Sequence, residues 1–254
     1  MAIDEAVLEA VGQNQSLPTL RLYAWEPPCL SIGYAQPNID VVKERLFERG
    51  WDWVRRPTGG RAILHTDELT YSILAPLSDQ RVSGGVLESY QRLSQALLTT
   101  LHSLNIPAEA HPINPTKNIQ GNGPVCFEVL SNYEIVVGGK KLIGSAQARR
   151  KNGVLQHGTL PLWGDLTRIT QVLAFSDEQD RREAASRLLS HATTVETILG
   201  YKISWELAAQ AFIEGFQSEL NIDLVRDDLS MQESIRAEKL VDEKYSHPSW
   251  SERI

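Results

Sequence analysis

The 254-residue sequence contains only two cysteines, Cys29 and Cys126, and no long apolar run. Two cysteines cannot build a disulfide framework, and neither has a second thiol or a histidine at zinc-site spacing, so we expect no metal site. A transmembrane helix needs roughly 18 consecutive apolar residues, and no run in the chain approaches that length. We therefore expect neither a membrane protein nor a disulfide-stabilised secreted one.

Positive charge is also scarce, since 25 Lys and Arg stand against 32 Asp and Glu, for a net charge of −7. This balance argues against general nucleic-acid binding. The first five residues, MAIDE, include two acidic side chains and no basic one, which is not typical of a signal or transit peptide. We expect a cytoplasmic protein whose thiols are free, with Cys29 as a small buried residue.

Hydrophobic periodicity predicts an α+β fold, in which short, mainly antiparallel strands precede a helical C-terminal third, without βαβ alternation. No linker is evident before about residue 195. We expect one domain over 1–254, in which 195–254 can form a small helical subdomain. A loop is expected at 108–125, and Ser204 is an expected N-cap. The expected helices are 3–11, 41–49 and 86–104, with mostly helix over 165–220, and the expected strands are 20–23, 29–34, 53–54, 61–64, 69–74, 133–137, 140–143 and 154–162.

The segment RRPTGGRAILH at 55–65 packs three arginines, two glycines and one histidine into eleven residues. Glycines between strands let the backbone approach a ligand or adopt positive φ, and arginines supply fixed charge and planar donors. Taken alone, the segment also fits a hairpin turn flanked by solvated arginines.

Two further segments carry chemistry, CFEVLSNYE at 126–134 and GGKKLIGSAQ at 138–147, the latter followed by LQHGTL at 155–160. Each has an ordinary alternative. Lys141 fits an exposed strand lysine, residues 144–146 fit a close packing point between backbones, and His157 fits a buried histidine with satisfied hydrogen bonds.

In this order, the segments resemble the lipoate–protein ligase and octanoyltransferase family, whose catalytic domain is related to biotin–protein ligases and class II synthetases. LTYS at 69–72 adds to the match, and weaker similarity runs from the N-terminus to about residue 200. The resemblance implies a mixed, mainly antiparallel sheet flanked by helices. It also implies a catalytic pair, Cys126 and Lys141, and no metal ligands. The substrate-binding residues that it implies are Arg56, Gly59, Gly60, Arg61, His65, Tyr71, Gly144, Ser145, Ala146, His157 and Gly158.

Three activities of the family fit the chain. An octanoyltransferase moves an octanoyl group from acyl carrier protein, through a cysteine thioester, to a lysine of a lipoyl domain, in glycine-cleavage H protein or a 2-oxoacid dehydrogenase E2, and needs no cofactor. A lipoate ligase instead uses ATP and Mg to make lipoyl-AMP. An amidotransferase takes the octanoyl group from H protein and gives it to E2 lipoyl domains.

The transferase is favoured because Arg61 stands where ligases tend to have glycine, Leu64 replaces an aromatic residue, and Cys126 lies in a segment similar to the transferases' catalytic one. We expect Cys126 to attack the donor thioester and Lys141 to contact the acyl carbonyl. We expect His65 or His157 to help remove the proton of the acceptor amine. Leu64 and Tyr71 are candidate apolar neighbours of the acyl slot.

Two features concern the ends of the chain. The family usually has a short strand before its first helix, whereas here Met1 begins at that helix. The chain is also too short for the extra C-terminal domain of many bacterial ligases, which adds weakly to the case for a transferase.

Overall fold

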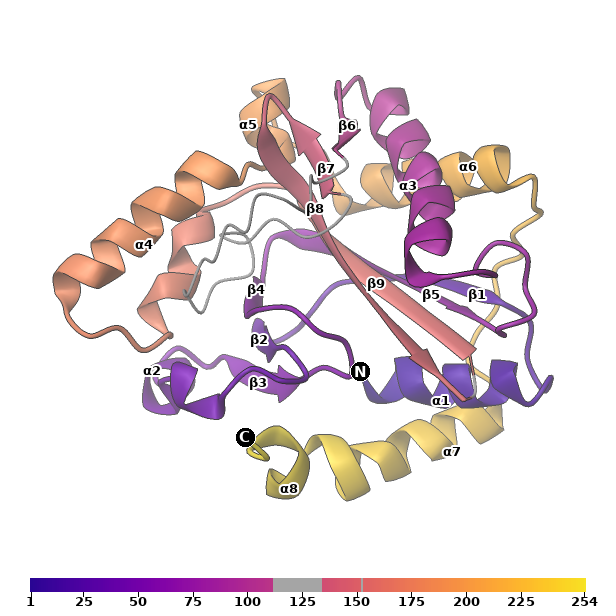
Figure 1. Ribbon diagram of the computed structural model, residues 1–254, viewed down its shortest axis with the longest axis horizontal. Helices are drawn as coiled ribbons and strands as arrows, with labels where there is room; N and C mark the ends of the chain where they lie inside the picture. The colour runs from indigo at the N-terminus through magenta and orange to yellow at the C-terminus, as the bar shows by residue number, and fades with distance from the viewer. Residues whose placement is uncertain (112–133, 152) are drawn as a thin grey trace.

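A computed structural model describes residues 1–111, 134–151 and 153–254, and an antiparallel six-stranded sheet crosses its centre (Figure 1). The strand order is β1-β5-β9-β8-β7-β6. Short edge strands flank three long central ones, so the expected mixed fold with a mainly antiparallel sheet is confirmed. The strands are Thr19–Tyr23 (β1), Glu68–Ala75 (β5), Glu109–His111 (β6), Glu134–Val137 (β7), Lys140–Arg150 (β8) and Gly153–Pro161 (β9).

A second, three-stranded sheet has the order β3-β2-β4. Cys29–Ile32 (β2) runs parallel to Asp52–Arg55 (β3) and antiparallel to Ile63–His65 (β4). The parallel pair is joined by a crossover through a 3₁₀ turn, Asn38–Asp40, and a short helix, Lys43–Phe47 (α2). This pair is a single parallel crossover, and the other strand pairs of the two sheets are antiparallel, as an α+β fold without βαβ alternation predicts.

Several predicted boundaries also move because of tertiary pairing. The predicted helix 41–49 is shorter because Val41 is extended and bridges Leu173. The strand predicted over 140–143 continues to residue 150 because it pairs with β9 along its length. The predicted loop over 108–125 begins with a strand, since residues 109–111 pair with β7. The rest of that loop lies outside the described residues.

Two long helices cover one face of the large sheet (Figure 1). Val86–Ser103 (α3), predicted from its apolar spacing, is confirmed, and it packs on Trp205–Leu220 (α6). The hydroxyl of Ser204 accepts the amide of Leu207, so the predicted N-cap is also confirmed. Alternate β5 residues Leu69, Tyr71 and Ile73 join the helices in this core.

The opposite face of the sheet divides into an apolar and a polar half. Leu74 and Leu155 pack on the N-terminal helix Ala2–Gly12 (α1), which in turn contacts Met231–Leu240 (α7). Thr70 and Ser72 alternate with the core residues and so face the same side as α1. This polar half is where the two sheets approach each other.

The remaining helices surround these layers. Residues 195–254 take part in the same packing, since α6 belongs to the main core and α7 packs on α1. That these residues form a subdomain of their own stays a prediction. No helix in the described ranges is both long and apolar enough to span a bilayer. The further segments are the 3₁₀ helix Leu166–Gln171, Glu178–His191 (α4), Val195–Leu199 (α5), the π-helix Val241–Tyr245 and Pro248–Ser251 (α8).

Candidate active site

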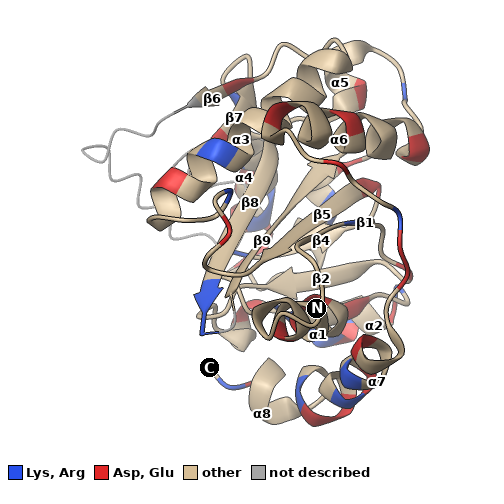
Figure 2. Cartoon of the chain, turned by 90° about the vertical axis from the view of Figure 1, so that its right-hand side faces the viewer, with Lys and Arg blue, Asp and Glu red and all other residues tan. Residues whose placement is uncertain are grey.

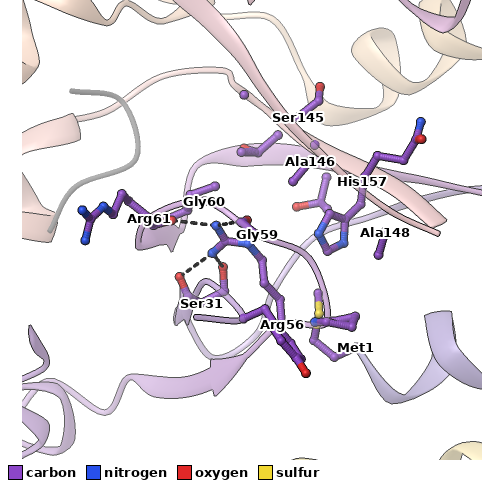
Figure 3. Close-up of a pocket in the computed structure, with 18 of the residues that line it drawn as sticks. Met1, Ser31, Arg56, Gly59, Gly60, Arg61, Ser145, Ala146, Ala148 and His157 are labelled. Atoms are coloured by element: carbon purple, nitrogen blue, oxygen red, sulfur yellow. Dashed lines mark hydrogen bonds between the residues drawn. The ribbon is translucent and has the colours of Figure 1, made fainter. Parts of the chain in front are cut away.

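A cavity of about 880 Å³ opens where the two sheets meet the start of α3 (Figure 3). The second half of β8, residues 144–150, pairs with β9 on one side and with no other described strand, so its free edge borders the cavity. The predicted site residues that line the cavity are Arg56, Gly59, Gly60, Arg61, His65, Lys141, Gly144, Ser145, Ala146, His157 and Gly158.

The turn at Gly59 and Gly60, called the glycine turn below, is held in place by an arginine of the same segment. Arg56 is only 3% exposed, and its guanidinium donates to the carbonyls of Ser31, Gly59 and Arg61 at 2.7–3.0 Å (Figure 3). Arg55 is fully buried as well. The alternative of a turn flanked by solvated arginines is therefore wrong for these two residues.

The turn also depends on a glycine that the sequence did not single out. A Cβ built on Gly33 would lie 1.8 Å from the carbonyl oxygen of Gly60, so no side chain fits there. Gly60 itself has φ +96°, a conformation that favours glycine. A Cβ on Gly59 would meet nothing within 4 Å. The turn thus needs Gly33 because the backbone of Gly60 lies against it, and it needs Gly60 because of its positive φ.

Gly158 brings β9 close to β8. A Cβ there would lie 2.6 Å from the carbonyl oxygen of Gly144 and 2.7 Å from the Tyr71 ring. Tyr71 is fully buried behind the wall and does not line the cavity; its hydroxyl is 2.6 Å from the Ser145 hydroxyl. Leu64 is also absent from the lining and packs on the core of the small sheet.

Lys141 is 2% exposed, so the alternative of an exposed strand lysine is wrong. Its Nζ donates to Glu134 Oε1 at 2.5 Å, across the β7–β8 hairpin. Glu134 is also buried, and breaking such a pair by removing one partner leaves an uncompensated charge. A buried lysine–glutamate ion pair therefore lies beside the cavity, with Lys141 in the cavity wall.

His157 is both buried and part of the cavity wall. Its Nε2 lies 2.6 Å from the Thr58 hydroxyl, and its Nδ1 lies 4.0 Å from the carboxylate of Asp4. Burial lowers the pKa of His157, although Asp4 opposes this shift. Burial by itself raises the pKa of Asp4, but His157 and nearby positive charges, including Arg21, lower it overall.

The two cysteines can be separated as candidate nucleophiles. Cys29 is buried as expected, and burial raises the pKa of its thiol to about 12, with a smaller contribution from Asp52. A thiol of that pKa is almost entirely protonated at neutral pH and is a poor nucleophile. Cys126 lies outside the described residues, so its assignment stays a prediction from the sequence.

The cavity wall is basic although the protein is acidic. No Asp or Glu lines the cavity among the described residues, whereas Arg56, Arg61, Lys141, Arg149 and Arg150 do. Figure 2 shows Lys and Arg positions, in blue, at the end of β8. Groups of three or more His, Cys, Asp or Glu that could hold a metal ion are absent from the described part of the chain.

Residues 1–217 match the family model of the lipoyl protein ligase A/B catalytic domain. The chain belongs to this family. Octanoyltransferase LipM of Symbiobacterium thermophilum is 37% identical over 257 residues, which cover 100% of this chain and 93% of that protein. Octanoyltransferase LipM of Kyrpidia tusciae is 39% identical over 259 residues, with the same coverage of both chains. The predicted family and enzyme class, an acyltransferase, are thereby confirmed.

Solved structures of lipoyl protein ligases share the fold. A bi-partite lipoate protein ligase from Thermoplasma acidophilum, described with its E2 lipoyl domain, superposes with a TM-score of 0.79 at 26% identity and covers 99% of this chain and 89% of its own. Lipoate-protein ligase A bound with ATP gives a TM-score of 0.77 at 26% identity, covering 98% of this chain and 91% of its own. This chain therefore has the same fold as these two ligases, and the fold alone does not distinguish a ligase from a transferase.

Proposed function

We propose that the protein transfers an octanoyl group from acyl carrier protein, through a thioester on Cys126, to the acceptor lysine of a lipoyl domain. The observation that carries this proposal is the set of named relatives: octanoyltransferases that match the whole chain at 37–39% identity. The cavity supports it because a buried lysine, ion-paired with Glu134, lies in a wall that is otherwise partly apolar.

The apolar part of the wall suits an acyl chain. Val86 and Leu87, at the start of α3, line the cavity and are 53% and 46% exposed. Ala146 and Ala148 line it from β8, where small side chains leave room beside the backbone. Burying an acyl chain here would remove apolar surface from water at about 25 cal/mol per Å².

Lys141 is suited to stabilise negative charge on the acyl oxygen. Its ammonium group is held in the cavity wall by Glu134, where an N–H donor can face the acyl oxygen. A donor placed where an oxyanion develops contributes about 10²–10³-fold to the rate of acyl transfer. Cys126 would supply the nucleophile, because the other cysteine is buried with a raised pKa.

The basic rim suits the acidic surface or the phosphate of a carrier protein. Arg150 is exposed and Arg149 half-buried, and both lie at the cavity. Arg61 also lines the cavity. Such charges act mainly on the rate of encounter, and salt screens them over about 8–10 Å.

A donor comparison tests the proposal. The protein is incubated with apo lipoyl domain and octanoyl-acyl carrier protein, octanoylated H protein, or lipoate with ATP and Mg, and the mass of the lipoyl domain is followed. We expect the carrier-protein arm to be fastest and independent of ATP. Turnover only with ATP would identify a ligase, and turnover only with octanoylated H protein an amidotransferase.

Charge reversal at the rim tests the carrier-protein donor. Arg150→Glu should raise KM for octanoyl-acyl carrier protein while leaving KM for octanoyl-pantetheine unchanged. Arg182→Glu, an exposed site on α4, is the matched control. Equal KM values in Arg150→Glu and the control would show that this part of the rim does not bind the donor.

A further inference from the structure

His65, at the end of β4, is held by partners at both ring nitrogens. It is 5% exposed, its Nδ1 lies 2.5 Å from Glu68 Oε1, and its Nε2 lies 2.8 Å from Ser31 Oγ. The ring of Trp25 stacks on it at 4.4 Å between centroids, with an interplanar angle of 16°. Position and orientation of the imidazole are therefore fixed before any substrate binds.

The hydrogen-bond partners of Glu68 also determine which nitrogen of His65 carries the proton. Thr70 Oγ1 donates to Glu68 Oε1 at 2.5 Å, and Thr159 donates to the other carboxylate oxygen. An ionised carboxylate only accepts, so the His65 Nδ1 carries a hydrogen and donates it to Glu68. The Nε2 lone pair then faces the Ser31 hydroxyl.

The hydrogen bonds of Ser31 agree with this tautomer of His65. Arg56 Nη1 donates to Ser31 Oγ at 3.3 Å and to the Ser31 carbonyl at 3.0 Å. Since guanidinium only donates, the Ser31 oxygen accepts from Arg56, and its own hydrogen points to His65. In this series of hydrogen bonds each group donates towards the Glu68 carboxylate, as in a serine–histidine–acid arrangement.

Other groups on the wall are less suited to accept a proton. Lys141 forms an ion pair with Glu134 and, as an ammonium, can only donate. His157 directs Nε2 to Thr58, which does not line the cavity, and Nδ1 towards Asp4. Ser31 and His65, in contrast, both border the cavity, Ser31 as a fully buried residue just behind its surface and His65 with 5% of its surface exposed.

We propose that Ser31, His65 and Glu68 form a proton relay for the step in which the acceptor lysine attacks the acyl-enzyme. This inference rests on the proposed function. The amine nitrogen bonds to the acyl carbon while the bond from that carbon to the Cys126 sulfur breaks, and the electron pair leaves with sulfur. The amine proton passes to Ser31 Oγ as the Ser31 proton passes to His65 Nε2.

The proton then returns from His65 to the thiolate of Cys126, which restores the free enzyme. Glu68 touches no substrate in this scheme. It is a positioning residue that fixes the tautomer of His65 and stabilises the imidazolium formed during transfer. General base catalysis of this kind contributes about 10²–10⁴-fold.

Two nucleophiles separate the relay from a structural role. The protein is first loaded with octanoyl-acyl carrier protein, and decay of its octanoyl adduct is followed after adding lipoyl domain or hydroxylamine. Hydroxylamine is largely unprotonated at neutral pH and needs less help from a base. We expect His65→Gln to slow transfer to lipoyl domain about 10²-fold or more, with hydroxylamine cleavage nearly unchanged.

Ser31→Ala and Glu68→Gln should show the same selective loss, smaller for Glu68→Gln because the imidazole remains. His102→Gln, on α3 and outside the cavity lining, is the matched control and should behave as wild type. Each variant must load octanoyl, which shows that its site has folded.

The outcomes distinguish this inference from the proposed function. A wild-type protein that never carries an octanoyl adduct overturns both. Adduct formation followed by equal transfer rates in wild type and His65→Gln overturns the relay alone. Equal losses with lipoyl domain and hydroxylamine also overturn it, because they indicate that His65 only supports the shape of the site.

Discussion

Arg55 is fully buried and has no carboxylate partner among the described residues, and replacing it should release the C-terminal segment from the site. Its guanidinium donates to the carbonyls of Gly33 and Gln36 at 2.9 and 2.6 Å, and to those of Trp250 and Ser251 at 3.0–3.2 Å. The indole of Trp250 donates back to the Arg55 carbonyl at 3.0 Å. One side chain therefore joins residues 33–36, a loop that borders the cavity, to α8.

Arg55→Met keeps most of the side chain's volume but removes every donor. Each buried carbonyl left unsatisfied costs about 1–3 kcal/mol. Water can reach some of them once α8 moves away, so we expect a total loss of about 3–5 kcal/mol. In a domain of this size each kcal/mol lowers Tm by about 2–4 °C, so Tm should fall by at least about 6 °C.

Thermal unfolding and hydrogen exchange provide the assay. The amides of residues 248–254 should exchange faster in Arg55→Met than in wild type, because their anchor is lost. Arg182→Met is the control: this arginine pairs with Glu178 on the exposed side of α4, where ion pairs contribute little. If Arg55→Met unfolds at the same temperature as Arg182→Met, the reasoning about this buried arginine is refuted.

Three further variants test other parts of the site. Gly33→Ala should unfold at a lower temperature than Gly59→Ala, since only the first methyl group collides with the Gly60 carbonyl; equal Tm values would contradict this. Unfolding free energy should fall as pH drops below about 6.5, because the lowered pKa of His157 lets the unfolded chain bind more protons; an unchanged slope in His157→Asn would contradict it. Lys141→Met should lose about 10²–10³-fold in kcat of octanoyl transfer; a loss under tenfold would exclude oxyanion stabilisation.

The sequence predicted elements whose signals are local. The apolar spacing of α3, the cap at Ser204 and the glycine pair of the β7–β8 hairpin each depend on a few neighbouring residues, and the structure confirms all three. The structure also brings residues of 55–65, 138–147 and 155–160 to one cavity, a grouping that the family resemblance implied and their spacing did not. Residues 126–133 of the cysteine segment lie outside the described residues.

Features that depend on distant partners were missed. The second half of β8 reads GSAQARR, which has few residues that favour strands, and it is extended because β9 pairs with it. Arg55 is 195 residues from Trp250, so no local pattern could reveal their contact. Ser31 and Glu68 were overlooked because a lone serine or glutamate in a strand is common, and their role is visible only once β2, β4 and β5 lie together.

The central claim is that octanoyl is carried on Cys126, and intact-mass analysis after incubation with octanoyl-acyl carrier protein, without ATP, tests it most directly. We expect an octanoyl adduct that peptide mapping places on Cys126, that is retained in Cys29→Ser, and that disappears when lipoyl domain is added. Full turnover in Cys126→Ser, or an adduct on another residue, would contradict the account.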